Sequence, residues 1–385
     1  MNPILSIVIP TKNRQKYCIE AIKTVVALND ERVEIVIQDN SDEKTLESQI
    51  ASNGWNVVYN YHEGVISFVD NFSEAVEKSS GKFLCVIGDD DGVLPNIVQM
   101  TEMMDKQNID CLVPGLYSIY AWPSEKPFFK NAENGYLQLT CKKNKFYEIS
   151  CAEALSRLLK NAGQDYQNLH LPRLYHGIVR RSCLDVIKEK TGAYFNGLTP
   201  DIYNAVALSL VSPKTVVADF PITVSGMCPK SGSADSATGR HTGSLADAPH
   251  FRGHDSYTWD EKIPAVYSVE SIWAETVVHA LRDFGREDLC EQFNVAGFDR
   301  LCYAVYPQFA EEIQKHASDH GVSRGSLLLS KMTYKPKMLI KKCARRVFGT
   351  KNSYFYNVYD ITDAIRITVE NFEKIDTSQQ ILGGE

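Results

Sequence analysis

Residues 82–92 read KFLCVIGDDDG, an apolar run that leads directly into three aspartates and a glycine. Similar short runs occupy Leu5–Pro10, Val33–Ile37 and Trp55–Tyr61, and each is bounded by polar residues. Runs of this length and composition are typical of strands that are buried on both faces of a sheet. The first hundred residues are therefore predicted to contain four buried strands.

Helical patterns separate these strands. The residues that share one helical face are Ile19, Ile22 and Val26 in a first segment, and Phe68, Phe72, Ala75 and Val76 in a later one, with Ser67 as its N-cap. Alternating strands and helices imply a parallel sheet with right-handed crossovers. We predict an α/β fold, in which a mostly parallel sheet is flanked by helices and a helical domain follows at the C-terminal end.

The composition argues against several classes of protein. With 385 residues, of which 44% are hydrophobic, the chain has the proportions of a globular protein with two domains. Its formal net charge of -7 argues against a nucleic-acid partner. No run approaches the roughly 18 consecutive apolar residues of a transmembrane helix. The ten cysteines are scattered, so the reducing cytosol is the expected location.

The chain is predicted to divide near residue 257. Strand and helix patterns alternate regularly over residues 1–111 and become mixed over 112–225, and together these two parts form the first domain. Residues 226–256 are dense in Gly, Ser and Ala and form a long loop, either a functional lid or a disordered linker. Helical patterns then dominate residues 257–385.

In a parallel sheet, ligands collect beyond the carboxyl ends of the strands. Three such ends, Pro10–Arg14, Gln38–Ser41 and Gly88–Gly92, are expected to line one crevice. Asp89 and Asp91 can turn toward it and hold Mn²⁺ or Mg²⁺, which then bridges two phosphates of a nucleotide. The alternative is a plain Asp-Asp-Gly turn, although three adjacent like charges repel one another unless a cation or solvent compensates them.

Asp39 ends the second predicted strand. An acidic residue at this point can accept hydrogen bonds from a base or from a ribose hydroxyl. The alternative is a turn formed with the Asn and Ser that follow. The glycines that a dinucleotide-binding fold requires after its first strand are missing from Pro10–Arg14.

Taken together, these motifs resemble family 2 glycosyltransferases of the GT-A fold. The similar stretches are SIVIPTKNR (6–14), QDNSDE (38–43) and HEGVISFVDNFSEAVEKSSGKFLCVIGDDD (62–91). The resemblance is specific over residues 4–100, fainter to residue 225 and absent beyond. It implies a nucleotide-sugar donor, with a UDP-sugar favoured, a divalent cation held by the Asp-rich motif, and inversion at the anomeric carbon.

The resemblance also implies roles for single residues. Residues 1–111 would form the donor half of the domain, and residues 112–225 the acceptor half. Asp89 and Asp91 would be the two metal-binding acids, and Asp39 would contact the base or the ribose. The other residues on the donor side would be Pro10, Thr11, Asn13, Arg14, Asn71 and Asp90.

Inverting transfer needs a base near the acceptor hydroxyl, and in this family the base is an acidic residue about a hundred positions after the Asp-rich motif. Asp201 is the best match, with Asp165 and Asp235 next. The alternative for Asp201 is an ordinary helix start, in which Thr199 is the N-cap and Pro200 the first helical residue.

The loop at 226–256 is rich in cationic and imidazole side chains. As a lid, it would close these groups on the diphosphate leaving group. Whether a histidine of this loop completes the metal site is left open. The cationic and imidazole residues of the loop are Lys230, Arg240, His241, His250, Arg252 and His254.

The function predicted from the sequence is an inverting, metal-dependent glycosyltransferase. Its acceptor would be a hydroxyl of a glycan or a lipid-linked oligosaccharide, in the synthesis of capsule, O-antigen or a related bacterial polysaccharide. One alternative is a sugar-phosphate nucleotidyltransferase, which should have a Gly-rich loop where this chain has PTKNR. The other is a non-catalytic module that binds a nucleotide sugar.

A basic segment lies near the C-terminal end. Residues 320–359 contain nine Lys or Arg and no acidic residue. On a helical wheel, Leu339–Phe348 has an apolar half opposite Lys341, Lys342, Arg345 and Arg346. Such a helix either lies on anionic lipid at the cytoplasmic face of the inner membrane or packs its apolar half on the helical domain.

Overall fold

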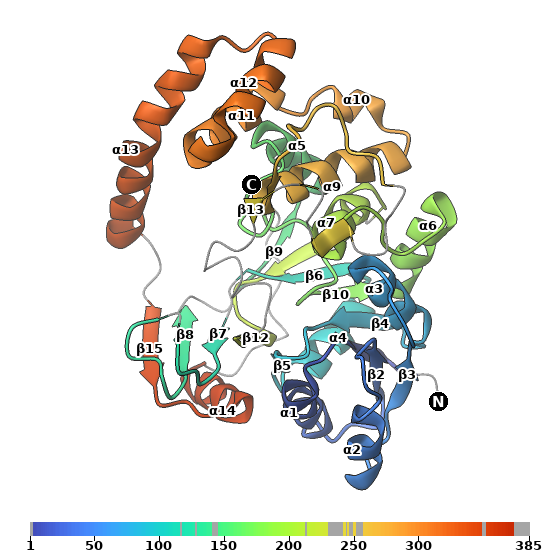
Figure 1. Ribbon diagram of the computed structural model, residues 1–385. Coiled ribbons are helices and arrows are strands. Elements are labelled where there is room, and N and C mark those ends of the chain that lie inside the picture. Colours follow the sequence, from blue (N-terminus) through green and yellow to red (C-terminus); the bar gives the residue numbers. More distant parts are fainter. Residues whose placement is uncertain are drawn as a thin grey trace.

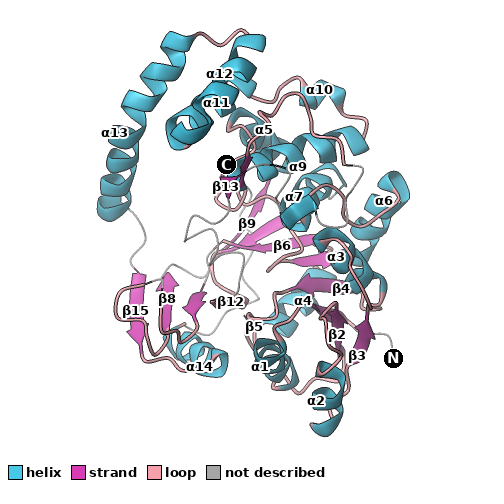
Figure 2. Cartoon of the chain, in the orientation of Figure 1, coloured by secondary structure: helices cyan, strands magenta, loops and turns pink. Residues whose placement is uncertain are grey.

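The computed structural model describes residues 3–115, 118–127, 129–140, 145–211, 214–229, 242–243, 245, 249–251, 257–348 and 352–372, without the side chains of 341–342 and 344–348. Helices cover both faces of a large sheet, and a smaller sheet lies beside it (Figures 1 and 2). The α/β architecture predicted from the sequence is therefore confirmed.

The large sheet has eight strands in the order β3-β2-β1-β4-β10-β6-β11-β9. Strands β1, β2, β3 and β4 run parallel, as do β6 and β11, whereas β10 and β9 are antiparallel to their neighbours. Their bounds are β1 (Leu5–Thr11), β2 (Val33–Asp39), β3 (Val58–Tyr61), β4 (Phe83–Val86), β6 (Cys111–Pro114), β9 (Phe146–Ile149), β10 (Ile178–Arg180) and β11 (Thr215–Ala218).

Two layers of helices cover this sheet because its side chains alternate between the two faces. In β1, Ile7 and Ile9 pack with α1 (Gln15–Val26), α2 (Leu46–Ser52) and α4 (Ile97–Lys106). Val8 points to the other face, into the cluster formed by α3 (Phe68–Glu77), α5 (Cys151–Lys160), α6 (Arg181–Thr191), α7 (Pro200–Val211) and α9 (Val269–Asp283). As predicted, Ser67 caps α3 and accepts a hydrogen bond of 2.9 Å from the backbone N–H of Asp70.

The smaller sheet has five strands in the order β15-β8-β7-β12-β5. These are β5 (Gly92–Val93), β7 (Ser118–Ala121), β8 (Tyr136–Thr140), β12 (Thr223–Met227) and β15 (Asn352–Tyr356). β15 follows the C-terminal helices and pairs with β8, and α14 (Ile361–Asn371) contacts α1, β5, β7 and β12. The last described part of the chain therefore returns to the N-terminal part.

The region after residue 257 is helical, as expected, apart from β14 (Tyr267–Ser268) and β15. Its remaining elements are α10 (Glu287–Cys290), α11 (Val295–Val305), η3 (Pro307–Phe309), α12 (Ala310–Asp319) and α13 (Arg324–Phe348). The predicted loop at 226–256 begins inside β12 and contains β13 (Thr242–Gly243) and η2 (Pro249–Phe251). Within the described ranges, no helix is both long and apolar enough to cross a membrane.

Glu275 of α9 is a buried carboxyl that ties the segment before α9 to that helix. Its side chain accepts hydrogen bonds of 3.1 Å from the Tyr257 hydroxyl and from the Asp260 backbone N–H. Burial raises the pKa of Glu275 to about 7, because it penalises the charged form.

We expect Glu275→Gln to flatten the pH dependence of stability. A raised pKa in the folded state makes a contribution that is present below pH 4.5, the ordinary pKa, and is lost as the pH rises through about 7. The charge then costs at most about 3 kcal/mol at neutral pH. Urea unfolding at pH 5 and pH 8 measures the difference, with the exposed Glu261→Gln as control. Equal pH dependence in the wild type and Glu275→Gln would contradict this assignment.

Candidate active site

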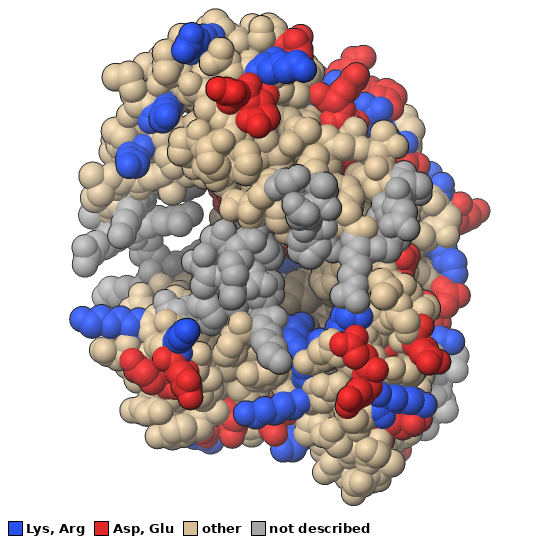
Figure 3. All heavy atoms as spheres, in the orientation of Figure 1, with Lys and Arg blue, Asp and Glu red and all other residues tan. Residues whose placement is uncertain are grey.

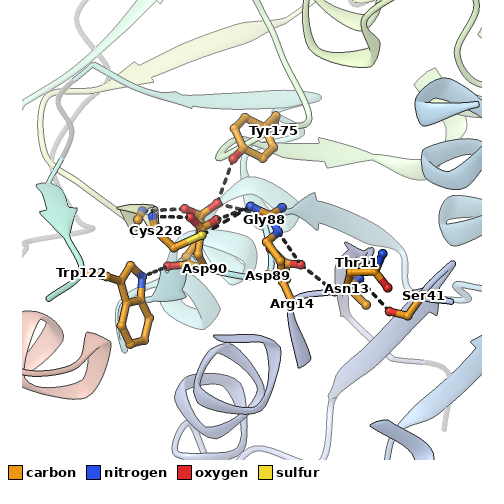
Figure 4. Close-up of polar contacts among 12 residues, drawn as sticks. Thr11, Asn13, Arg14, Ser41, Gly88, Asp89, Asp90, Trp122, Tyr175 and Cys228 are labelled. Atoms are coloured by element: carbon orange, nitrogen blue, oxygen red, sulfur yellow. Dashed lines mark hydrogen bonds and ion pairs between the residues drawn. The ribbon is translucent and has the colours of Figure 1, made fainter. Parts of the chain in front are cut away.

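The Asp-rich turn follows β4 and leads into β5, at the junction of the two sheets (Figure 4). Asp89, Asp90 and Asp91 are all buried, with exposed fractions of 0%, 4% and 0%. Three consecutive carboxylates taken out of water require nearby donors or cations, since each buried charge is costly when it has no partner. The partners of each aspartate therefore define what it can do.

Asp91 is held by hydrogen bonds from three separate segments. One carboxylate oxygen accepts from the Gly226 N–H at 2.6 Å, and the other accepts from the Gly88 N–H at 2.6 Å and the Tyr175 hydroxyl at 3.0 Å. His176 Nε2 lies 3.3 Å from that second oxygen. Burial raises the pKa of Asp91 to about 6, against the lowering effect of the bonds from Gly226 and Gly88.

Asp89 faces the end of β1. Its carboxylate accepts from the Thr11 hydroxyl at 2.6 Å and from Arg14 Nε at 3.0 Å, and its second oxygen lies 2.7 Å from Arg14 Nη2. Burial alone would lower the pKa of Arg14, but Asp89 and Asp90 raise it well above its ordinary value. The guanidinium therefore stays charged. Burial also raises the pKa of Asp89, although Arg14 opposes this effect.

Asp90 is the least occupied of the three carboxylates. One oxygen accepts from the Cys228 N–H at 2.8 Å, whereas the other lies 3.7 Å from Arg14 Nη1. Its backbone carbonyl accepts from Trp122 Nε1 at 2.9 Å, which holds the turn from the side away from Thr11 (Figure 4). Burial raises the pKa of Asp90 as well.

The residues present fit a divalent cation that shares its ligands with a nucleotide. Arg14 pairs with Asp89 and Asp90, and Asp91 adds a third carboxyl beside them, so carboxyl groups outnumber the paired guanidinium at the turn. In the described part of the chain, no three His, Cys, Asp or Glu residues form a metal cage. Mg²⁺ and similar ions are commonly held by one or two carboxylates plus substrate phosphates. Asp90 has the more open oxygen, 3.7 Å from Arg14 Nη1, whereas both oxygens of Asp91 accept hydrogen bonds and both oxygens of Asp89 contact Thr11 or Arg14.

β12 approaches the turn so closely that only glycine fits at position 226. A Cβ atom there would lie 1.8 Å from the carbonyl oxygen of Asp90. Gly226 therefore lets the backbone of β12 reach Asp91, and Cys228 follows two residues later to reach Asp90. This approach of one backbone to another is a frequent reason for glycine at a site.

The other two predicted strand ends lie side by side. Asn13 has a positive φ of 56°, and its N–H donates to the Ser41 hydroxyl at 2.8 Å. Asp39 is buried and accepts from the Ser41 N–H and the Tyr59 hydroxyl, both at 2.8 Å. Pro10 is paired with Gln38 in the sheet register. The three predicted strand ends are thus adjacent, because Thr11 and Arg14 join the first of them to the Asp-rich turn.

Asn71 of α3 is a buried polar residue. Its side chain is 6% exposed, and the side-chain oxygen has no hydrogen-bond partner among the described residues. A buried polar oxygen without a partner is costly, and a bound molecule can supply the missing donor.

Asp201 lies in the first turn of α7. Its carboxylate accepts from the Thr199 hydroxyl and, at 2.7 Å, from the Tyr166 hydroxyl. One turn later in α7, Asn204 accepts from the Leu174 N–H at 2.9 Å, and the neighbouring Tyr175 donates to Asp91. Through this short chain of contacts, α7 is fixed relative to the Asp-rich turn.

A cavity of about 780 Å³ opens between α3 and α9. Asn196 and Gly197, a few residues before Asp201, line one wall, and Tyr257 and Trp259 contribute aromatic surface. Aromatic rings together with amides and carboxylates are a combination suited to polyhydroxylated ligands, since it offers both apolar faces and hydrogen-bond partners.

Several residues of the site were not predicted from the sequence. Trp122, Tyr175, His176 and Cys228 contact the turn from positions 32 to 138 residues away. Burial and Arg173 lower the pKa of His176 to about 3, so its ring is neutral beside Asp91. The segment LYHGIVRR containing Tyr175 and His176 reads as an ordinary strand, and the positive φ of His176, 62°, has no sequence signature.

Of the six predicted lid residues, the structure describes only His250. Lys230, Arg240, His241, Arg252 and His254 lie outside the described residues. His250 is described, and its Nδ1 lies 3.1 Å from the Tyr267 hydroxyl.

Comparison with known proteins gives one family. Residues 6–162 match the family model described as "Glycosyl transferase family 2". No curated protein sequence matches the chain.

Among solved structures, the chain is similar to S. aureus TarS 1-349 in complex with UDP-GlcNAc, with 13% identity, 86% of this chain and 92% of that chain covered, and a TM-score of 0.46. It is also similar to the mannosyltransferase PcManGT from Pyrobaculum calidifontis in complex with GDP-Man and Mn²⁺, with 12% identity, 90% and 88% covered, and a TM-score of 0.37.

The family match agrees with the resemblance inferred from the sequence motifs. The matched residues 6–162 contain the Asp-rich turn and the ends of β1 and β2, so the part of the chain that carries the candidate site is similar to glycosyl transferase family 2.

Proposed function

We propose that this protein transfers a sugar from a nucleotide-diphosphate donor to a hydroxyl of a glycan or lipid-linked oligosaccharide, with inversion, in the synthesis of a bacterial surface polysaccharide. The observation that carries the proposal is the buried Asp-rich turn at the carboxyl edge of a parallel sheet, within the segment that matches the model of glycosyl transferase family 2. A UDP-sugar is the favoured donor.

The donor would lie across the three adjacent strand ends. Asp39 would contact the base or the ribose, Asn13 would border the nucleotide, and the unpartnered oxygen of Asn71 could accept a hydrogen bond from the donor. The phosphates would meet Arg14 and a cation held by Asp89 and Asp90. When bound, Mn²⁺ or Mg²⁺ supplies positive charge that offsets the charge developing on the leaving diphosphate.

Asp201 is proposed as the base. In inverting transfer, the acceptor oxygen bonds to the anomeric carbon as the bond to the diphosphate oxygen breaks, and the acceptor proton must be removed. The bonds from Thr199 and Tyr166 orient the carboxylate for this role. The cavity between α3 and α9, which begins beside Gly197, is the proposed place for the acceptor glycan.

Two alternatives remain testable. A nucleotidyltransferase is disfavoured because the segment after β1, Lys12–Arg14, lacks the glycines of a phosphate-binding loop. A non-catalytic binding module would show no turnover. Nucleotide release from a panel of UDP, GDP and dTDP sugars with Mn²⁺, abolished by EDTA, would support an enzyme.

Asp90→Asn and Asp91→Asn should separate cation binding from support of the turn. Asp90→Asn removes a charge, and the amide oxygen can still accept from the Cys228 N–H. Mn²⁺-dependent nucleotide affinity should therefore fall at least 10-fold while the melting temperature changes little. Asp91→Asn places an amide N–H against backbone donors, which should cost about 2 kcal/mol of stability. Calorimetry and thermal unfolding measure the two effects. Unchanged Mn²⁺-dependent affinity in Asp90→Asn would contradict the cation assignment.

Asp201→Asn should abolish transfer without weakening donor binding. The substitution keeps the side-chain size, so nucleotide affinity should stay within about twofold, while transfer falls by roughly 10²-fold or more. Tyr166→Phe removes one orienting hydroxyl and should give a smaller loss. If Asp201→Asn retains near-normal transfer, the base is another carboxylate, with Asp165 next in line.

A further inference from the structure

Helix α13 lies at the outer edge of the molecule (Figure 1). One side of its first half packs on α11. Leu327 is fully buried there, the Ser330 hydroxyl donates to the Arg300 carbonyl at 3.0 Å, and Arg300 Nε donates to the Ser326 hydroxyl at 2.7 Å. From Lys335 onward, every residue of α13 whose side chain is described is exposed.

The side of α13 that faces away from α11 carries large apolar side chains. Leu329 is 62% exposed, Met332 75%, Leu339 63% and Ile340 68%. At about 100° per residue, these four fall with Leu328 and Cys343 within an arc of about 120°, roughly opposite Leu327 and Ser330. We call this set of six residues the apolar stripe. It runs along more than four turns of the helix.

Cations border the apolar stripe. Arg324, Lys331 and Lys335 are exposed and follow one another along one edge of it. Figure 3 shows basic groups along the part of the surface that α13 occupies. No acidic residue occurs in 320–359, although the whole chain has a net charge of -7. The apolar stripe and its border of cations thus form one continuous surface with a charge opposite to that of the rest of the protein.

We propose that α13 docks on an anionic lipid surface, with the apolar stripe in the headgroup boundary and the bordering cations on lipid phosphates. A helix with an apolar face flanked by Lys and Arg binds such an interface through burial of apolar surface and through attraction of its cations to anionic lipid. The occupant is a membrane and not a second copy of the chain, because two such cationic borders would repel each other. The acidic remainder of the protein is repelled by the same lipid, which orients the molecule.

The sequence alone left two hypotheses for this region, and the structure favours this one. Leu339 and Ile340, which the packed-helix alternative would bury on the helical domain, are exposed. The side chains of Lys341, Lys342, Arg345 and Arg346 lie outside the described residues, so the inference rests on the preceding four turns. It does not depend on the proposed catalytic function.

Docking of α13 would bring the smaller sheet, which flanks the candidate active site, close to the membrane. The chain passes from α13 into β15, the edge strand of the smaller sheet, whose strands β12 and β5 flank the Asp-rich turn. A lipid-anchored α13 therefore keeps this sheet close to the surface on which a lipid-linked acceptor would be found.

Vesicle co-sedimentation tests the proposal. The full chain is mixed at low salt with vesicles of phosphatidylcholine alone or with 40% phosphatidylglycerol. Two variants test the two contributions separately. The first replaces apolar side chains of the stripe (Leu329→Gln, Met332→Gln and Leu339→Gln), and the second reverses bordering charges (Lys331→Glu and Lys335→Glu). Matched controls change exposed residues elsewhere: Val186→Gln with Val369→Gln, and Lys106→Glu with Lys190→Glu.

We expect the wild type and both controls to bind only the anionic vesicles, and each α13 variant to lose at least about 10-fold in affinity. Circular dichroism and Mn²⁺-dependent nucleotide binding should be unchanged in all variants, which separates this result from the catalytic proposal. Absence of wild-type binding, or equal binding by the α13 variants, overturns the inference. A dimer of the wild type that the apolar variant converts to a monomer in sedimentation velocity would instead make the apolar stripe a contact between copies.

Discussion

The carboxylate of Asp91 is the interaction on which the rest of the site depends. It joins the Asp-rich turn to Gly226 of β12 and to Tyr175 before β10, so both sheets meet at one side chain. A carboxylate removed from water is tolerated only when other donors replace the lost hydration. Because these donors come from separate segments, a shift of the turn would leave a buried N–H unpaired, and the neighbouring Asp89 and Asp90 are fixed by the same constraint.

The fixed turn holds more carboxyl groups than paired cations, and a bound donor adds further negative charge. Arg14 is the cation that pairs with Asp89 and Asp90, and burial raises the pKa of both carboxyls because it penalises their charged forms. Free diphosphate would be repelled by such a site. This is the physical reason for proposing that the nucleotide binds together with a cation, and that Arg14 forms the positive wall on the β1 side.

Much of the fold could be predicted from the sequence because its signals are local. The apolar runs gave β1, β2 and β4 within two residues, and the Ser67 cap gave the start of α3. The partners of the turn could not be predicted, since Gly226 and Cys228 act through their backbone N–H groups, which any sequence possesses. Likewise, nothing distinguished Asp91 from Asp90 as the occupied carboxylate, because the difference lies in contacts more than 80 residues away.

The pairing of β15 with β8 has a consequence for the biosynthesis of the protein. The smaller sheet contains residues from Gly92 to Tyr356, so on the ribosome it cannot close until most of the polypeptide has been made. Contacts of such long sequence separation form slowly. Until β15 arrives, the edge of β8 offers unpaired backbone groups to other nascent chains. The edge of the smaller sheet is thus completed only near the end of translation, whereas the hydrogen-bond partners that the structure describes for the Asp-rich turn, the last of which is Cys228, have been synthesised long before.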